Sequence, residues 1–287
     1  CNPLHISLCK WADIIMVAPI TATSISKWIT GNAEGLVSSI LIANTKPVIV
    51  APAMNTNMWL NTAIQHNYKL LKTYPNVLVM EPAEGLLACD QIGIGKIPPN
   101  DLILLALDFV LAKKKQKMSN DLSNKSFLIT GGGTSEKIDP ARRITNNSSG
   151  AMGLVLAHAA RFRGAKVNYI HGPLRISKDL NEGIRSQEVQ TSYDLEIAIK
   201  KEIDNCDYLI MNAAVTDIKL IDNNLLKIPK KDLGNYLSSN FTIVPDILRE
   251  ISHLKKNNQI FTGFCAFTGD LEKMRLIVKK KFEIKGC

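Results

Sequence analysis

Short apolar runs rich in branched side chains alternate along the chain with segments whose apolar residues recur at helical spacing. The short runs predict strands at 13–17, 48–50, 77–80, 126–130, 167–171 and 207–211. The longer segments predict helices at 25–28, 32–43, 56–71, 102–112 and 153–163, and 6–11 is predicted as an amphipathic turn. Alternation of this kind is typical of parallel sheets covered by helices on both faces. We therefore expect an α/β fold with two doubly wound, Rossmann-like domains of three layers.

A polar, lysine-rich segment at 113–125 separates these predicted elements into two groups. It has no apolar periodicity, which is typical of an exposed linker. A basic run can also bind nucleic acid or acidic lipid, but a solvated linker is the more common use. We expect one domain at 1–112, a linker at 113–125 and a second domain at 126–287.

Composition narrows the class of protein. The 287 residues are 46% hydrophobic, which suits two ordinary folded domains. No apolar run reaches the ~18 residues of a membrane span. The six cysteines are scattered, without Cys-x-x-Cys pairs or zinc-site spacing, as in a reduced cytoplasmic protein. The chain begins at Cys1 and ends at Cys287 within an amphipathic pattern, so we expect it to be part of a longer protein.

The net charge of +9 indicates anionic partners. Nucleic acid is one such partner, but aromatic residues make up only 6% of the chain and do not interleave with basic ones. Small anionic substrates explain the charge equally well. We expect small-molecule substrates and neither nucleic acid nor membrane as partners.

Asn55 lies just after the predicted strand 48–50, in the segment Ala-Pro-Ala-Met-Asn-Thr-Asn-Met-Trp at 51–59. Ligands bind at this edge of open α/β sheets, and a neutral amide can donate to a carboxylate. Capping of the helix 56–71 is the alternative, since Asn caps helices well. The segment resembles the Pro-x-Met-Asn-x-x-Met-Trp signature of phosphopantothenoylcysteine decarboxylases, flavoproteins of coenzyme A synthesis. The matching residues are Pro52, Met54, Asn55, Met58 and Trp59.

Two further segments resemble the same family. The first, at 5–13, reproduces its His-Ile-x-Leu-x-Lys-Trp-Ala-Asp pattern from His5 onward. The second, at 88–98, contains glycines and prolines without periodicity and predicts a flexible loop that acts as a lid. It resembles the family's Ala-Cys-Gly-Asp-x-Gly-x-Gly-Arg flap, although a lone loop cysteine is usually inert. Cys89, Gly93 and Gly95 match this flap. Asp90, Gln91 and Lys96 depart from it.

The resemblance implies a role for each of these residues. In the family, flavin mononucleotide (FMN) oxidises the substrate thiol to a thioaldehyde, carbon dioxide leaves, and the reduced flavin returns a hydride. His5 is then the acid or base near the thiol, Asn55 holds the carboxylate, and Cys89 gives the final proton. Thr21 and Thr23 follow the strand 13–17 and are expected to make part of the FMN contact, with helix capping as the alternative.

The second domain opens with three glycines at 131–133, directly after the strand 126–130. Glycines let the backbone approach a phosphate closely, but this turn is neither Gly-x-Gly-x-x-Gly nor a P-loop. Segment 130–153 resembles phosphopantothenate–cysteine ligase, which has Thr-x-Gly-Gly-Thr-x-Glu-x-Ile-Asp-Pro-x-Arg and then Ile-Ser-Asn-x-Ser-Ser-Gly-Lys-Met-Gly. The donors around 148–150 precede the helix 153–163 and suit a phosphate. The departures are Arg143, Thr145 and Ala151.

The ligase resemblance implies a further set of binding residues. Asn146 contacts the acyl-nucleotide intermediate, Asp217 recognises the cytidine nucleotide near Mg²⁺, and Lys227 offsets phosphate charge. An aspartate after a strand is more often a cap or turn, and lysines on a helix are usually solvated. The other matching residues for substrate or CTP are Pro245, Asp246, Ile247, Leu248, Phe264, Lys281 and Lys285. The departures here are Pro229, Val244 and Phe267.

The resemblance covers nearly the whole chain in the family's domain order. It implies a flavodoxin-like decarboxylase part at 1–112 and a ligase part at 126–287. The implied enzyme joins 4'-phosphopantothenate to cysteine through an acyl-cytidylate and then decarboxylates 4'-phosphopantothenoylcysteine to 4'-phosphopantetheine. The expected cofactors are FMN and Mg²⁺, with CTP as co-substrate, and the expected assembly is a homo-oligomer.

Two alternatives remain. A dinucleotide-dependent oxidoreductase needs an acidic residue about 20 positions after the glycine turn, at the end of the second strand. His171 and Gly172 stand at that strand's end, which argues against it. A non-catalytic regulatory relative needs no intact site, whereas the candidate catalytic and binding residues are all present here.

Overall fold

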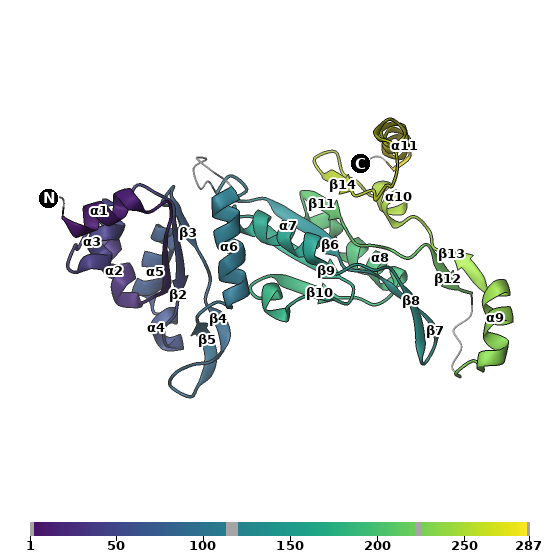
Figure 1. Ribbon diagram of the computed structural model, residues 1–287, viewed down its shortest axis with the longest axis horizontal. Coiled ribbons are helices and arrows are strands. Elements are labelled where there is room, and N and C mark those ends of the chain that lie inside the picture. Colours follow the sequence, from purple (N-terminus) through teal and green to yellow (C-terminus); the bar gives the residue numbers. More distant parts are fainter. Residues whose placement is uncertain (1–2, 113–119, 222–225, 286–287) are drawn as a thin grey trace. The chain divides into compact units, whose positions relative to one another are not determined.

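The computed structural model describes residues 3–112, 120–221 and 226–285. It divides the chain into two compact units, Cys1–Asp121 and Leu122–Cys287 (Figure 1). Most of the predicted linker, 113–119, lies outside the described residues. Among the helices in the described part, none combines the length and apolar character that crossing a membrane requires.

The first unit is built on a three-stranded parallel sheet in the order β1-β2-β3. Its strands are β1 (Ile15–Ile20), β2 (Val48–Pro52) and β3 (Val77–Val79). The central strand β2 is buried at every position, as its continuous apolar run predicts for a parallel sheet covered on both faces.

Helices cover both faces of this sheet. Helices α2 (Ala22–Ile29), α3 (Leu36–Ala43) and α5 (Thr62–Leu71) share a buried cluster with Val48 and Val50 of β2. Helix α6 (Asn100–Ala112) packs against β2 from the opposite side (Figure 1). Successive β2 side chains point to opposite faces, so this one strand packs against helices on both sides of the sheet.

The helix predicted at 56–71 is wrong as a single element. It is two helices, α4 (Thr56–Leu60) and α5, because Asn61 ends the first and caps the second. The Asn61 side chain accepts a hydrogen bond from the Ala63 N–H at 2.9 Å. Helix α1 (Leu4–Trp11) packs against α3 but buries none of its residues.

The segment 88–98, predicted as a flexible loop that acts as a lid, also has a different structure. Residues 83–96 form an antiparallel hairpin of β4 (Ala83–Leu86) and β5 (Ile92–Lys96). Only the turn between the strands and the segment after β5 are irregular.

The second unit contains a five-stranded parallel sheet in the order β10-β9-β6-β11-β14. The chain starts in the middle with β6 (Ser126–Gly131) and adds β9 (Lys166–His171) and β10 (Arg185–Glu188) on one side. It then crosses to β11 (Tyr208–Met211) and β14 (Ile260–Gly263) on the other side. The predicted α/β fold is confirmed, and the strand order reverses between β6 and β11, where doubly wound sheets bind ligands.

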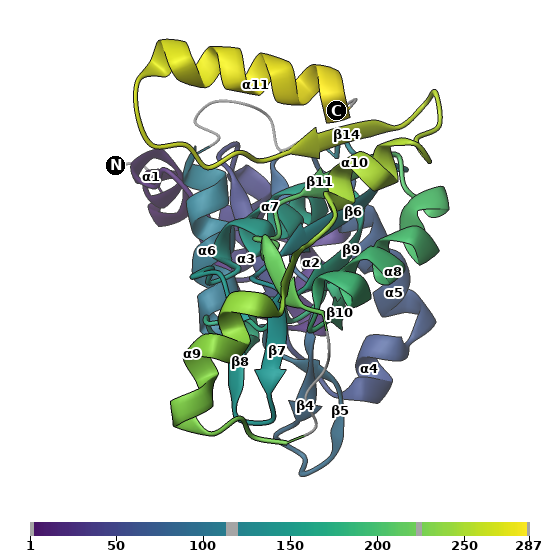
Figure 2. The same ribbon diagram turned by 90° about the vertical axis from the view of Figure 1, so that its right-hand side faces the viewer.

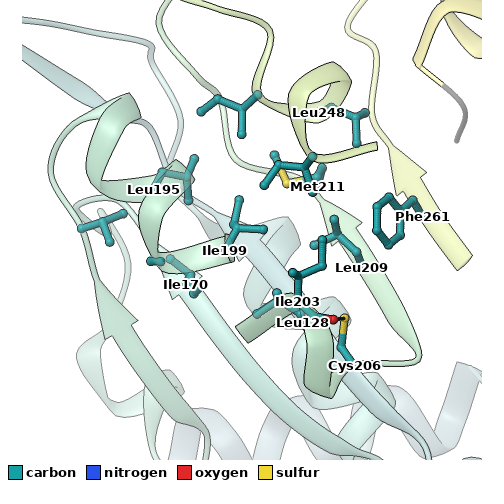
Figure 3. Close-up of a cluster of buried hydrophobic side chains, with 14 residues drawn as sticks. Leu128, Ile170, Leu195, Ile199, Ile203, Cys206, Leu209, Met211, Leu248 and Phe261 are labelled. Carbon is teal, nitrogen blue, oxygen red and sulfur yellow. Dashed lines mark hydrogen bonds between the residues drawn. The ribbon is translucent and has the colours of Figure 1, made fainter. Parts of the chain in front are cut away.

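Helices cover both faces of this sheet, which makes three layers in all. Helix α7 (Ala151–Phe162) packs on the face that carries Phe127, Ile129 and Tyr169. Helices α8 (Ser192–Glu202) and α10 (Ile247–Ser252) pack on the other face, in the cluster drawn in Figure 3 with Leu128 and Leu209. Two 3₁₀ turns, Lys178–Asn181 and Ile203–Asn205, precede β10 and β11.

Two antiparallel strand pairs extend from the unit. They consist of β7 (Ser135–Asp139) with β8 (Arg142–Thr145), and β12 (Ile218–Leu220) with β13 (Phe241–Ile243). Helix α9 (Lys230–Ser239) completes this arm around a small core of Ile138, Leu220 and Ile228. Helix α11 (Leu271–Lys285) lies against α10 near the end of the chain (Figure 2).

Candidate functional sites

A cleft of about 380 Å³ opens between the loop after β2 and the β4–β5 hairpin. Asn55 and Cys89 both line it, and the Asn55 Nδ2 donates a hydrogen bond to the Cys89 Sγ at 3.3 Å. The Asn55 Oδ1 accepts from the Asn57 N–H at 2.8 Å, so the side chain also caps α4. The capping and binding interpretations are therefore compatible, because capping uses the oxygen and leaves the amide N–H groups toward the cleft.

The hairpin that carries Cys89 is held against the loop that carries Asn55. The Met54 N–H donates to the Gly95 carbonyl at 2.9 Å. A Cβ at Gly95, whose φ is +140°, would lie 2.1 Å from the Met54 carbonyl oxygen, and one at Gly93 would lie 2.4 Å from the Thr56 hydroxyl. Gly95 lets backbone pack on backbone, and Gly93 makes room for the Thr56 side chain. These contacts dock the hairpin on the loop, which is why the flexible-loop prediction is wrong.

The turn of the hairpin exposes the thiol. The Leu87 N–H donates to Gln91 and the Asp90 N–H donates to Leu87, at 2.9 and 3.0 Å, and Asp90 has a φ of 58°. Cys89 is exposed at the tip of this closed turn. Apart from Asn55, Cys89 and Lys96, the cleft is lined by apolar residues and Gly95: Ala53, Met54, Leu86, Leu87, Ala88 and Ile97.

The other residues predicted for the decarboxylase lie elsewhere in the unit. His5 is half-buried on α1 and is not part of the cleft lining. Thr21 is the N-cap of α2, where its hydroxyl oxygen accepts from the Ser24 N–H at 3.3 Å, and Thr23 is exposed in the first turn. The structure thus brings Asn55 and Cys89 together but places His5, Thr21 and Thr23 outside their cleft.

In the second unit, the loops after β6 and β11 meet at the reversal of strand order. The Ala214 N–H donates to Gly132 at 2.8 Å, and the Thr134 N–H donates to Ala214 at 3.2 Å. Asn146 joins this contact, because its Nδ2 donates to the Val215 carbonyl at 2.8 Å. Asn146 therefore lies beside the loop that carries Asp217, whose side chain is exposed.

A buried polar network beneath these loops was not predicted from the sequence. The Thr134 hydroxyl accepts from the Thr216 N–H at 2.9 Å, and the Glu136 carboxylate accepts from the Ser192 N–H at 2.7 Å. The Thr216 hydroxyl lies 3.4 Å from the same carboxylate. Threonines at the ends of two neighbouring strands were the only available signal.

Arg143, one of the departures from the resembled pattern, also stabilises this region. Its guanidinium donates to the Ser135 hydroxyl at 2.7 Å and to the Ser135 carbonyl at 2.8 Å. A third bond, at 3.3 Å, reaches the Gln190 side chain. Arg143 thereby ties β8 to β7 and to the segment before α8.

The start of α7 provides backbone donors. Gly150, the N-cap, has a φ of +82° and offers no side-chain cap, while the Ser149 hydroxyl accepts from the Ala151 N–H at 3.3 Å. The N-terminus of a 12-residue helix attracts anions through its free N–H groups and its dipole.

Lys227 lies at the opposite end of the β7–β8 hairpin from Asn146. The hairpin pairs Ser135 with Thr145 at its base and Asp139 with Arg142 at its tip. The Ile228 N–H donates to the Asp139 carboxylate at 3.2 Å, which fixes the segment after Lys227 at this tip. Burial raises the pKa of Asp139, but backbone N–H groups and the Arg142 charge outweigh it, so the pKa is lower than usual. Four residues of strand place Lys227 roughly 13 Å from the base of the hairpin.

The last group of predicted residues gathers where β14 ends. The Lys285 Nζ forms an ion pair with the Asp246 Oδ2 at 2.7 Å, and the Lys281 Nζ lies 3.4 Å from the Cys265 Sγ. Asp246 also caps α10, since its Oδ1 accepts from the Arg249 N–H at 3.2 Å.

The neighbours of Asp246 differ in what they can offer a ligand. Pro245 and Phe264 are exposed. Ile247 and Leu248 are buried in the core, so only their backbone atoms can reach a ligand.

Comparisons with known proteins agree with this division into two units. A family profile described as "Flavoprotein" matches residues 2–112, and one described as "DNA/pantothenate metabolism flavoprotein C-terminal domain" matches residues 122–287. The class is thus a two-part α/β flavoprotein of pantothenate metabolism.

Two curated relatives, both called coenzyme A biosynthesis bifunctional protein CoaBC, cover almost all of the chain. The one from Vibrio vulnificus is 36% identical over 284 residues, which is 98% of this chain and 68% of the relative. The one from Bacillus subtilis is 38% identical over 273 residues, which is 93% of this chain and 64% of the relative. The chain belongs to the CoaBC family of bifunctional coenzyme A biosynthesis proteins.

One solved structure, the C-terminal domain of a coenzyme A biosynthesis bifunctional protein CoaBC, is 31% identical. Its alignment covers 59% of this chain and 76% of that domain, with a TM-score of 0.48.

Proposed function

We propose that this chain contributes to both activities implied for its family. The first is CTP-dependent ligation of 4'-phosphopantothenate with cysteine, and the second is FMN-dependent decarboxylation of 4'-phosphopantothenoylcysteine to 4'-phosphopantetheine. The observation that carries the decarboxylase part of the proposal is the contact between the Asn55 amide and the Cys89 thiol in one cleft. The two residues come from separate motifs, 34 positions apart, and each was assigned to the same reaction from the sequence.

In the proposed decarboxylation, Asn55 binds the substrate carboxylate through Nδ2 while its oxygen stays on the α4 cap. Cys89, 3.3 Å away, is placed to deliver a proton to the carbon that loses carbon dioxide. FMN, when bound, supplies the oxidation and reduction of the substrate thiol carbon.

The start of α2 fits part of an FMN contact. Thr21 and Thr23 place two exposed hydroxyls beside the N–H groups of its first turn, a donor set suited to an anion or a ring edge. His5 lies outside the cleft of its own chain, so its proposed acid or base role requires a neighbouring copy. A homo-oligomer is therefore part of the proposal.

In the proposed ligation, the start of α7 and the 131–133 turn bind the nucleotide phosphates, and Asn146 orients the acyl-cytidylate beside the Asp217 loop. No group of three His, Cys, Asp or Glu side chains suited to a metal occurs in the described parts of the chain. Mg²⁺ commonly uses one or two carboxylates together with substrate phosphates. The exposed Asp217 carboxylate fits such a partial site.

Release of pyrophosphate that depends on both CTP and 4'-phosphopantothenate tests the ligase proposal. The phosphate-neutralising role that the resemblance implies for Lys227 predicts that Lys227→Gln lowers this rate on the order of 10²-fold, the scale for losing one stabilising charge or donor. The place of Lys227 at the tip of the β7–β8 hairpin, roughly 13 Å from the base, predicts little change instead, so this variant decides between the two. Lys230→Gln, an exposed lysine on the same arm, serves as the matched control. Absence of CTP-dependent release from the unmodified protein refutes the ligase role and favours a non-catalytic relative. An unchanged rate in Lys227→Gln refutes only the proposed role of Lys227 and leaves the ligase proposal standing.

The oxidoreductase alternative gains no support from the second unit. The residue at the end of β9 is His171, which is 4% exposed, and its Nδ1 lies 2.8 Å from the Gly172 carbonyl oxygen. A buried imidazole engaged with the backbone cannot replace the carboxylate that holds a ribose in dinucleotide enzymes.

A further inference from the structure

Tyr169 is a fully buried tyrosine in β9 whose function the sequence did not indicate. It is 0% exposed and faces α7 across the sheet surface. Its hydroxyl donates to the Gly150 carbonyl at 3.2 Å. Burial raises the pKa of Tyr169 above its ordinary value, so the hydroxyl stays a donor at any physiological pH. A buried hydroxyl needs a partner, and here the partner is the N-cap residue of a helix.

Two glycines make room for this hydroxyl. A Cβ at Gly131, where β6 ends, would lie 2.2 Å from the Tyr169 oxygen. A Cβ at Gly153, in the first turn of α7, would lie 3.1 Å from the same oxygen and 3.0 Å from the Gly131 Cα. The phenol thus fills the space where the glycine turn and the helix start approach each other most closely.

The bond to Gly150 sets the direction of an amide that faces outward. The Gly150 carbonyl also accepts from the Leu154 N–H at 3.2 Å, so both bonds hold one peptide group. Because a trans peptide is planar, fixing the carbonyl of Gly150 fixes the Ala151 N–H in the opposite direction. That N–H points to the Ser149 hydroxyl at 3.3 Å, on the side where the helix start is open to an anion.

His171 supports the other side of the same turn. Its ring stacks on Tyr169, with centroids 5.1 Å apart, and its Nδ1 lies 2.8 Å from the Gly172 carbonyl. Gly172 in turn donates its N–H to Gly131 at 3.0 Å. The stacked pair therefore anchors the loops on both sides of the glycine turn without being exposed itself.

We propose that Tyr169 is a positioning residue for nucleotide phosphate, one that presets the amides at the start of α7 through the Gly150 peptide. This inference rests on the proposed ligase function and adds a residue that touches neither substrate nor nucleotide. Preorganised donors bind an anion more tightly because no free energy is lost in orienting them. Removing the hydroxyl leaves the Gly150 carbonyl bonded to the Leu154 N–H, so the fold is retained while one of the two bonds that orient this peptide is lost.

The test is Tyr169→Phe, which keeps the ring and removes only the hydroxyl. We expect the KM for CTP in pyrophosphate release to rise roughly threefold to tenfold, the scale of one net hydrogen bond, with little change in kcat. The matched control is Tyr208→Phe. Tyr208 lies on the same face of the sheet and stacks on Phe127 at 4.5 Å. An unchanged KM in Tyr169→Phe, or an equal rise in Tyr208→Phe, overturns the inference.

Two measurements without turnover separate this inference from the ligase proposal. Calorimetric binding of inorganic pyrophosphate should weaken by the same factor in Tyr169→Phe, at a temperature where thermal melts show both proteins folded. Hydrogen exchange at residues 151–153 should be faster in the ligand-free variant. If the unmodified protein turns over CTP but these quantities do not change, only the role of Tyr169 fails. If it binds pyrophosphate as expected without turnover, only the ligase proposal fails, and absence of pyrophosphate binding overturns the inference.

Discussion

Replacing Gly95 by alanine should separate Cys89 from Asn55 without touching either residue. The added Cβ would lie 2.1 Å from the Met54 carbonyl oxygen, and Cβ atoms essentially never approach another heavy atom within 3.0 Å. Strand β5 must therefore retreat by about 0.9 Å, the difference between these two distances. The obstacle is backbone, so no side-chain rotation can relieve it.

The free energy of docking the hairpin can be estimated from two losses. Moving β5 lengthens the 2.9 Å bond from the Met54 N–H to Gly95 beyond hydrogen-bond range, at about 0.5–1.5 kcal/mol. Alanine at a φ of +140° adds strain, on the order of 1–3 kcal/mol. The docked hairpin is then destabilised by roughly 2–4 kcal/mol. A misplacement of about 1 Å in a catalytic group can lower a rate 10²-fold.

The assay is carbon dioxide release from 4'-phosphopantothenoylcysteine by FMN-loaded protein. Gly31→Ala is the control, because Gly31 has a φ of +72° but no atom within 4 Å of an added Cβ. It reproduces backbone strain in the same unit without the collision. We expect Gly95→Ala to lose on the order of 10²-fold in rate while Gly31→Ala retains it. A wild-type rate in Gly95→Ala, or an equal loss in both variants, would refute the argument that glycine contact positions Cys89.

Two further predictions follow, one for the first unit and one for the second. Asn55→Asp should abolish carbon dioxide release, since a carboxylate repels the substrate carboxylate, yet keep the melting temperature because Asp also caps helices; unchanged release removes Asn55 from its role. Burial lowers the pKa of His158 to about 4, with the Arg161 charge adding to the effect and the Leu180 carbonyl opposing it. The unfolded chain therefore binds a proton that the folded one does not, and the free energy of unfolding should fall by up to about 3 kcal/mol as the pH drops from 6.5 toward 4. Urea unfolding at pH 7.5 and 4.5 measures this loss, which His158→Gln should lack; equal pH dependence in both proteins would contradict it.

The sequence predicted the sheets and their ligand-binding edges because burial leaves a local signal. A short, β-branched apolar run such as 48–50 is typical of a strand covered on both faces, and β2 has this environment. Asn55 follows that run directly, so its place at the sheet edge required no long-range information. The 131–133 turn was placed at the end of β6 for the same reason.

Contacts between distant segments left no such signal. The bonds from Asn146 to Val215 and from Tyr169 to Gly150 join residues 69 and 19 positions apart. Lys227 matched a binding motif, but the bond from the Ile228 N–H to Asp139 holds its segment at the tip of the β7–β8 hairpin. Register and hairpin direction decide such distances, and neither follows from residue type.

Glycines show most clearly where sequence patterns stop being sufficient. Gly31 and Gly35 have positive φ and open space around them, so they serve only to turn the chain. Gly95 and Gly131 instead have a backbone oxygen or a buried phenol within 2.2 Å of a would-be Cβ. In the sequence both kinds predict loops, yet only the second kind brings a loop to a fixed distance from another segment. In this chain Gly95 lies in the hairpin that carries Cys89, and Gly131 lies beside the start of α7. Substitution of these two glycines should therefore lower activity, whereas substitution of Gly31 or Gly35 should affect only stability.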